Sequence, residues 1–152
     1  MTGVSHRFPC RVYYEDTDHG GVVYYANYLK FMERGRTEYL RSAGIELDSV
    51  EKEEGVMFAV TEANIRYLSP ALFNDLLEIE STLTHARGAR LTFKQQIWRM
   101  HRENETRDTL LTEAEIKLAC IDRDGNARRI PASLIPVLAT HQTNSSKELP
   151  NG

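Results

Sequence analysis

The stretch EDTDHGGVVYYANYLKFMERGRTEYLRSAG, residues 15–44, predicts a polar loop followed by the longest helix of the chain. From about Tyr24 to Ala43 the apolar residues recur at helical spacing, and Gly44 is typical of the position that follows a helix end. Gly35 lies within the apolar stripe, although glycine costs about 1 kcal/mol of helix propensity relative to alanine. We interpret it as the point where the helix backbone packs closely against a sheet. The stripe consists of Tyr28, Phe31, Met32, Gly35, Tyr39 and Ala43.

The loop before this helix carries residues that could do chemistry. Asp16, Asp18 and His19 are followed by the pair Gly20-Gly21, and glycine lets a chain bend sharply. The first turn of the helix offers unpaired N–H groups that can hold a polarised carbonyl oxygen. A carboxylate beside them could attack a carbonyl or take a proton from water. Spacing alone leaves open whether the acids only cap loop amides, which of the two is functional, and whether His19 takes part.

The rest of the chain is typical of extended strands. Strands of ten or more residues are about 33 Å long or longer, and a 20-residue helix is about 30 Å long, so one curved antiparallel sheet could wrap the helix. We therefore predict an α+β fold with a single domain over residues 1–141, within which residues 1–7 have no regular structure. A polar, disordered tail is expected over 142–152. The sheet's edges and outer face then need cover, which favours oligomers. The expected elements are strands at Phe8–Tyr14, Phe58–Leu68, Asp75–His85, Leu91–Met100 and Thr109–Ile121, and a short helix at Pro131–His141.

Composition limits the function. The formal charge of −3, from 22 acids and 19 bases, argues against a general nucleic-acid binder. The chain has no run of about 20 apolar residues for membrane insertion and no apolar signal segment, and its two cysteines suggest no disulfide framework, so we expect a cytoplasmic protein. HxxxH and CxxC spacings are absent, so no metal site is predicted. Arg87 and Arg90 are either solvated strand ends or a site for ligand phosphates.

Two stretches, RVYYEDTDHGGVVYYANYLKFMERGRTEYLR (11–41) and IRYLSPALFNDLLEI (65–79), resemble a known family. They are similar to hotdog-fold acyl-CoA thioesterases of the 4-hydroxybenzoyl-CoA thioesterase family, and more closely to the branch associated with the bacterial Tol–Pal system. The resemblance spans roughly residues 7–138. It implies a five-stranded antiparallel sheet around a central helix, a homodimer or homotetramer, and an active site at the dimer interface.

The resemblance also implies residue roles. Asp18 falls on the family's catalytic acid, a nucleophile or general base, and the backbone N–H of Tyr25 on its oxyanion donor. Coenzyme A would be part of the substrate and the leaving group, so no separate cofactor is expected, and Arg87 and Arg90 are the candidates for holding its phosphates. Two positions depart from the pattern. The Tol–Pal branch commonly has histidine where Tyr25 stands, whereas the aryl-CoA branch has tyrosine. The resemblance therefore does not decide which acyl group the substrate carries. Asn74 replaces a frequent glycine but tolerates the left-handed conformation.

Two other functions remain open at this point. A hotdog dehydratase acting on hydroxyacyl thioesters would need a histidine base, for which His19 is available, but the HFP pattern of such enzymes is missing. A non-catalytic module that binds acyl thioesters or an acyl carrier protein would bind without turnover. Release of free thiol from CoA esters distinguishes both from hydrolysis.

Overall fold

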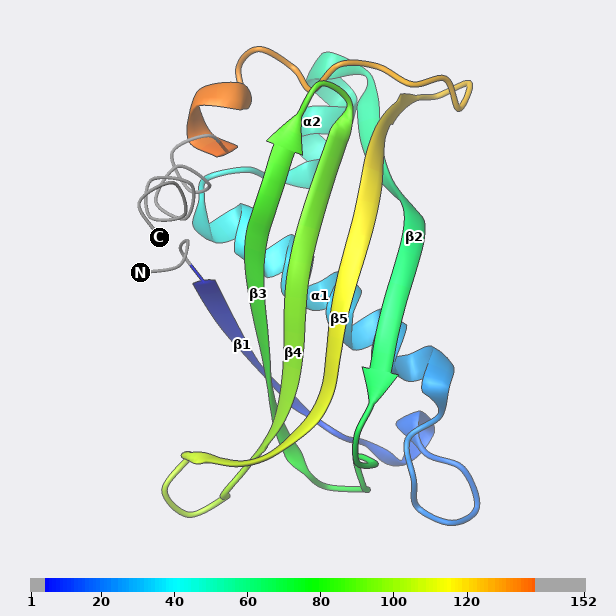
Figure 1. Cartoon of the computed structure of the whole chain (residues 1–152), viewed down its shortest axis with the longest axis vertical. Helices are drawn as coiled ribbons and strands as arrows, with labels where there is room; N and C mark the ends of the chain where they lie inside the picture. The colour runs from blue at the N-terminus through cyan, green and yellow to red at the C-terminus, as the bar shows by residue number, and fades with distance from the viewer. Residues whose placement is uncertain (1–4, 139–152) are drawn as a thin grey trace.

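The computed structural model describes residues 5–138 as one curved antiparallel sheet with a long helix across it (Figure 1). The strands are ordered β1-β3-β4-β5-β2, and every pair is antiparallel. The predicted α+β architecture of five strands and a central helix is therefore confirmed. The elements in chain order are β1 (Ser5–Arg11), the 3-10 helix η1 (Tyr14–Asp16), α1 (Tyr25–Ser42), α2 (Leu47–Glu54), β2 (Val56–Tyr67), β3 (Leu76–Arg87), β4 (Arg90–Met100) and β5 (Arg107–Asp122).

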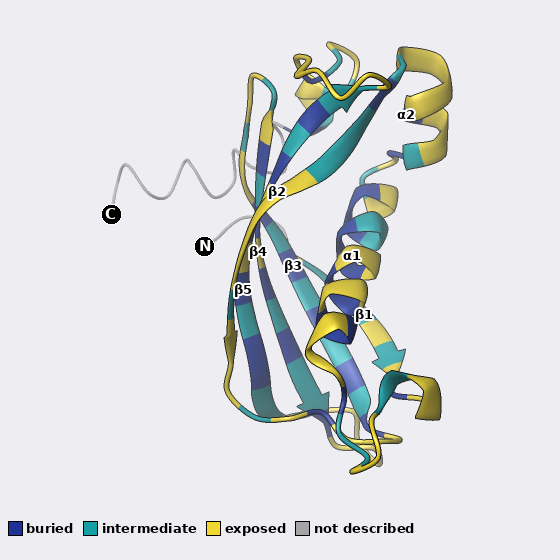
Figure 2. Cartoon of the chain, turned by 90° about the vertical axis from the view of Figure 1, so that its right-hand side faces the viewer, coloured by how far each residue is buried: buried dark blue, intermediate teal, exposed yellow. Residues whose placement is uncertain are grey.

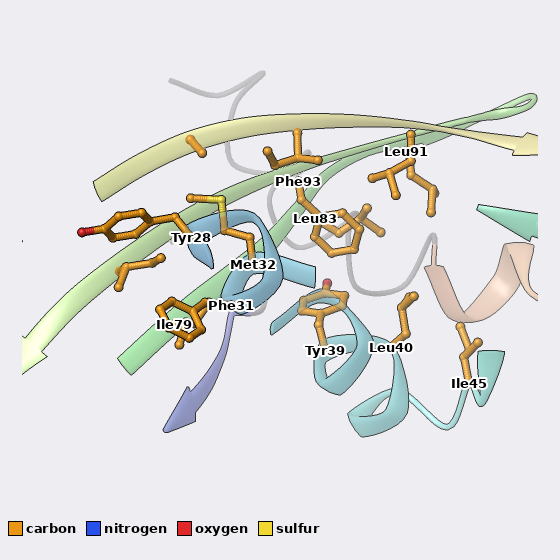
Figure 3. Close-up of a cluster of buried hydrophobic side chains, with 14 of the residues drawn as sticks. Tyr28, Phe31, Met32, Tyr39, Leu40, Ile45, Ile79, Leu83, Leu91 and Phe93 are labelled. Atoms are coloured by element: carbon orange, nitrogen blue, oxygen red, sulfur yellow. The ribbon is translucent and has the colours of Figure 1, made fainter. Parts of the chain in front are cut away.

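The core lies between α1 and the concave face of the sheet. Strands β3 and β4 alternate buried and partly exposed residues, as expected for strands with one face on a core. Figure 2 shows that the buried side of α1 faces the sheet. This side holds the predicted stripe from Tyr28 to Tyr39, whereas Ala43 lies just past the end of the helix and is only partly buried. Figure 3 shows side chains of the helix meeting side chains of β3 and β4. The labelled contributors include Tyr28, Phe31, Met32 and Tyr39 from α1 and Ile79, Leu83, Leu91 and Phe93 from the sheet.

Gly35 is the point of closest approach between α1 and the sheet, as predicted. A Cβ atom added there would lie 2.6 Å from Cγ2 of Ile79 and 3.0 Å from Oγ of Ser81. Carbon atoms pack at about 3.5–4.0 Å, so no side chain larger than hydrogen fits without a shift. The identity of residue 35 therefore sets how deeply the helix lies on the sheet.

A buried polar network fixes the helix at this point. The side-chain amide of Gln95 donates to the carbonyl oxygen of Met32 at 2.9 Å and to Oγ of Ser81 at 2.8 Å. Its oxygen accepts a hydrogen bond from Nη1 of Arg36 at 3.0 Å. Gln95 and Ser81 are fully buried. The nitrogen and the oxygen of the Gln95 side-chain amide both have hydrogen-bond partners. The network therefore connects α1 to β3 and β4 and leaves no polar atom of this side chain unsatisfied.

The structure differs from the sequence predictions at both ends of the chain. β1 begins at Ser5, so residues 5–7, predicted to be loose, pair with β3. It ends at Arg11, because its partner β3 begins at Leu76, and the predicted continuation to Tyr14 enters η1 instead. The other four strands and α1 agree with prediction to within two residues at each end. The helix α2 was not predicted.

The C-terminal predictions are only partly covered. Of the expected short helix at Pro131–His141, residues 135–138 are helical and the end lies outside the described residues. The tail predicted for 142–152 also lies outside them. Among residues 5–138, no helix is both long enough and apolar enough to cross a membrane.

Candidate active site

The acidic loop closes on itself around the carboxylate of Asp18. Oδ1 of Asp18 accepts hydrogen bonds from the N–H groups of Gly20 at 2.9 Å and Val22 at 3.3 Å. The backbone adds two more bonds, from the Asp18 N–H to the Val22 oxygen and from the Gly21 N–H to the Asp18 oxygen. Gly21 has a φ of +76°, which a residue with a side chain adopts only with strain. This glycine allows the turn that holds the carboxylate in one orientation.

The structure gives Asp16 and Asp18 different roles, which their spacing in the sequence did not distinguish. Oδ2 of Asp16 accepts a hydrogen bond from the N–H of Tyr13 at 2.9 Å, which closes η1. The carbonyl oxygen of Asp16 accepts from the Tyr24 N–H at 3.2 Å and from Nδ2 of Asn27 at 2.8 Å. Asp16 thus joins η1 to the start of α1. Asp18 is exposed, and within residues 5–138 its Oδ2 has no hydrogen-bond partner.

The segment between β2 and β3 is hydrogen-bonded to the loop that holds Asp18. The Val23 N–H donates to the Ala71 oxygen at 3.0 Å, and the Phe73 N–H donates to the Gly21 oxygen at 2.9 Å. The N–H of Ala71 donates to Oη of Tyr28 at 2.9 Å. The loop and the first turns of α1 are therefore attached to the same short segment.

A cavity of about 420 Å³ opens where this loop, α1 and the end of β2 meet. It has a largely aromatic and apolar wall, and among its described lining residues Asp18 alone carries a carboxylate. The backbone N–H of Tyr25, the first residue of α1, makes no hydrogen bond within the described chain, as expected for the first N–H groups of a helix. The cavity is lined by Asp18, Val22, Val23, Tyr24, Tyr25, Tyr28, Tyr67, Leu68, Ser69 and Pro70.

Three tyrosines form one side of this cavity. The ring of Tyr67 lies 4.6 Å from that of Tyr25 and 5.2 Å from that of Tyr28, measured between centroids. Burial raises the pKa of Tyr28, and burial followed by the nearby Tyr25 phenol raises the pKa of Tyr67. The hydroxyls of Tyr28 and Tyr67 are therefore uncharged near pH 7, and that of Tyr28 accepts the hydrogen bond from the Ala71 N–H. Tyr67 was missed as a site residue because only tertiary packing brings the end of β2 beside α1.

The predicted site residues are not all brought together. Asp18 and Tyr25 line the same cavity, whereas His19 is exposed and does not line it. Arg87 and Arg90 pair across the β3–β4 hairpin. Figure 1 shows this hairpin at one end of the sheet and the loop before α1 at the other. Among residues 5–138, no group of three or more His, Cys, Asp or Glu side chains is placed to hold a metal ion.

A long helix across a curved antiparallel sheet is also the fold of solved thioesterase structures. A probable thioesterase from Bartonella henselae superposes with a TM-score of 0.75 at 37% identity, covering 84% of this chain and 100% of the other. The 4-hydroxybenzoyl CoA thioesterase from Pseudomonas sp. strain CBS-3 has a TM-score of 0.78 over 88% of this chain and 98% of its own, at 22% identity. The latter likeness concerns the fold alone. Both support the hotdog fold implied by the resemblance.

The sequence comparisons define the family. The model of the Thioesterase superfamily matches residues 20–105. The acyl-CoA thioester hydrolase YbgC of Escherichia coli O6:H1 is 43% identical over 136 residues, which cover 89% of this chain and 96% of that protein. The chain belongs to the thioesterase superfamily.

Proposed function

We propose that this chain hydrolyses acyl-CoA thioesters to a free acid and coenzyme A, with Asp18 as the catalytic carboxylate. One observation carries the assignment of residues. Among residues 5–138, Oδ2 of Asp18 and the N–H of Tyr25 have no hydrogen-bond partner, and both residues line one cavity. The substrate is supported by relatives named as acyl-CoA thioester hydrolases.

The geometry suits either of two routes. In the first, an oxygen of Asp18 attacks the thioester carbonyl carbon, the thiolate of coenzyme A leaves and takes a proton, and water hydrolyses the resulting anhydride. In the second, Asp18 takes a proton from water while that water attacks the carbonyl. In both, the N–H of Tyr25 donates to the oxygen that becomes negative, and this donor is already oriented because it belongs to the helix start. Oxygen-18 found in the Asp18 carboxylate after a single turnover in labelled water identifies the first route, because only that route can place solvent oxygen in the protein.

Hydrolysis is better supported than the two alternatives. Dehydration needs a histidine base at the reacting carbon, and His19 does not line the cavity. A binding module would not need a carboxylate beside an electrophilic carbonyl. Thiol release from short-chain, long-chain and aryl-CoA esters tests the proposal: release with at least one class supports it, and binding without release points to a module. A separate cofactor is not part of the proposal.

We also propose that the enzyme works as a homodimer or homotetramer. α1 lies mainly over β1 and β3, and beyond it a groove of about 480 Å³ remains open toward β5 and β2. Its wall is mostly apolar, and Val60 on the edge strand β2 is 48% exposed. A second copy would cover this face, and sedimentation equilibrium at micromolar concentration tests it. A species with the mass of one chain would contradict it.

Arg87 and Arg90 stay candidates for the coenzyme A phosphates through such an assembly. Because their hairpin lies at the far end of the sheet from Asp18, they would reach coenzyme A only from another protomer. Replacing both by alanine should then raise KM for CoA esters but not for thioesters of N-acetylcysteamine, which lack phosphates. Equal effects on both substrates would argue against the assignment. Both cysteines are free, and we keep the cytoplasm as the proposed location and an acyl carrier protein as a candidate partner.

A further inference from the structure

The segment between β2 and β3 is held by an ion pair outside the cavity. Nε of Arg99, on β4, lies 2.9 Å from Oδ2 of Asp75, and Nη2 of Arg99 donates to the carbonyl oxygen of Pro70 at 2.7 Å. The same Oδ2 of Asp75 accepts a hydrogen bond from the Leu72 N–H at 2.9 Å. Asp75 is 7% exposed and the Arg99 side chain 23%, so this pair is partly shielded from water. One guanidinium therefore joins the two ends of segment 70–75.

Segment 70–75 has further contacts besides this ion pair: the Ala71 N–H donates to Oη of Tyr28, and the rings of Phe73 and Tyr14 stack at 3.9 Å between centroids. Ala71 is buried, but Leu72 and Phe73 are 42% and 38% exposed, so the segment contributes little apolar burial. Asn74 has a φ of +69°, which asparagine tolerates better than most residues. Backbone bonds to Val12 hold only the end that leads into β3. The start of the segment is held by Arg99, through the carbonyl oxygen of Pro70, together with the bonds that Ala71 makes to Val23 and Tyr28.

Segment 70–75 is attached to the loop of Asp18 by backbone bonds on both sides of Val22. The Ala71 oxygen accepts from the Val23 N–H, and the Phe73 N–H donates to the Gly21 oxygen. Val22 itself donates its N–H to Oδ1 of Asp18 at 3.3 Å. Side-chain rearrangement cannot absorb a shift of the segment, because these links are made by main-chain atoms. A displacement of the segment is therefore passed to the carboxylate.

We infer that Arg99 and Asp75 are positioning residues for the carboxylate of Asp18. Neither lines the cavity, so they act on the reaction through segment 70–75 rather than by touching substrate. The inference rests on the proposed function, in which Asp18 reacts. A misplacement of about 1 Å in a catalytic group can cost about 100-fold in rate. Loss of the clamp should therefore lower kcat, while KM for the CoA ester changes little.

The test compares Arg99→Lys with a matched ion pair on the same sheet. Lysine keeps the charge but lacks the planar fork with which the guanidinium bonds Asp75 and Pro70 from two different nitrogens. The control is Arg107→Lys: Arg107 bonds Glu78 and Glu80 at 2.9–3.0 Å, and its side chain is 26% exposed against 23% for Arg99. We expect Arg99→Lys to lower kcat at least 10-fold with KM within two-fold, and Arg107→Lys to keep both. Wild-type kcat in folded Arg99→Lys, or equal losses in both variants, overturns the inference.

A second measurement separates positioning from general destabilisation. Adding guanidinium at millimolar concentration to Arg99→Ala should restore kcat several-fold, whereas sodium chloride at equal ionic strength should not. Absence of rescue in a folded Arg99→Ala overturns the inference. If the variants of Arg99 do not fold, Asp75→Asn is measured instead. We expect a lower kcat in Asp75→Asn, and wild-type kcat in this variant overturns the inference. Asp18→Asn is measured alongside: if it keeps wild-type turnover the proposed function fails, and if it is inactive while Arg99→Lys is normal, only the positioning role fails.

Discussion

Replacing Gly35 by alanine is expected to destabilise the protein, although alanine is the better helix former. An added Cβ would lie 2.6 Å from Cγ2 of Ile79, about 1 Å inside a normal carbon–carbon contact. Ile79 is fully buried and β-branched, so it has no free space to rotate into. The methyl group would also lie 3.2 Å from Nε2 of Gln95, whose bonds would be strained if the helix moved away.

The magnitude follows from two opposing terms. Alanine gains about 1 kcal/mol over glycine in helix propensity. Overpacking a closed core costs about 1–3 kcal/mol, and the upper end applies at Gly35 because the overlap is with a branched side chain on a rigid strand. We therefore expect the free energy of unfolding to fall by about 2 kcal/mol.

Urea unfolding followed by far-UV circular dichroism measures this change. The control is Arg34, exposed on the same helix, where the alanine variant should be about 1 kcal/mol more stable than the glycine variant. The sign should be reversed at residue 35. In an Ile79→Ala background, Gly35→Ala should cost less, because Cγ2 of Ile79 is gone. If Gly35→Ala is as stable as wild type, the close approach of α1 to the sheet is not a constraint and the reasoning is wrong.

Three further predictions concern the site and its surroundings. Tyr28→Phe removes the acceptor for the buried Ala71 N–H and should cost about 1–3 kcal/mol in urea unfolding; an unchanged midpoint would contradict the bond. Asn74→Gly should keep the melting temperature whereas Asn74→Val should lower it, because φ is +69°, and equal values would count against a left-handed residue. Burial raises the pKa of Tyr39 from 10.0 to about 12, so the unfolded chain loses this proton first as pH rises. The free energy of unfolding should therefore fall by up to about 3 kcal/mol from pH 10 to 12, and by less in Tyr39→Phe; identical pH profiles would refute the shift.

The long elements were predictable because their patterns extend over many residues. The helical spacing of apolar residues in α1 and their alternation in β3 stay recognisable although single residues depart from the pattern. Gly35 was informative because a glycine within an apolar stripe indicates close packing. The helix α2 was not predictable, because it has eight residues of which only Val50 is buried. β1 was displaced because the end of a strand depends on where its partner begins, which no local pattern records.

The site was predictable only in part, for a related reason. The loop and the helix start are continuous in sequence, so Asp18 and Tyr25 could be proposed together. Choosing Asp18 over Asp16 from structure alone required the 3-10 turn of η1, which directs the Asp16 carboxylate to a backbone N–H. Tyr67 and Arg99 come from distant strands: Tyr67 contacts the rings of Tyr25 and Tyr28, and Arg99 bonds segment 70–75. Contacts between distant strands are not visible in the spacing of residues.

The measurement that tests the central claim most directly is thiol release by Asp18→Asn. Wild type, Asp18→Asn and Glu15→Gln are compared on whichever CoA ester the wild type hydrolyses fastest. Glu15 is an exposed carboxylate three residues away that does not line the cavity, so it controls for loss of charge. We expect Asp18→Asn to lose at least about 100-fold in kcat while remaining folded, and Glu15→Gln to match wild type. Wild-type turnover in Asp18→Asn would contradict the assignment of the catalytic carboxylate.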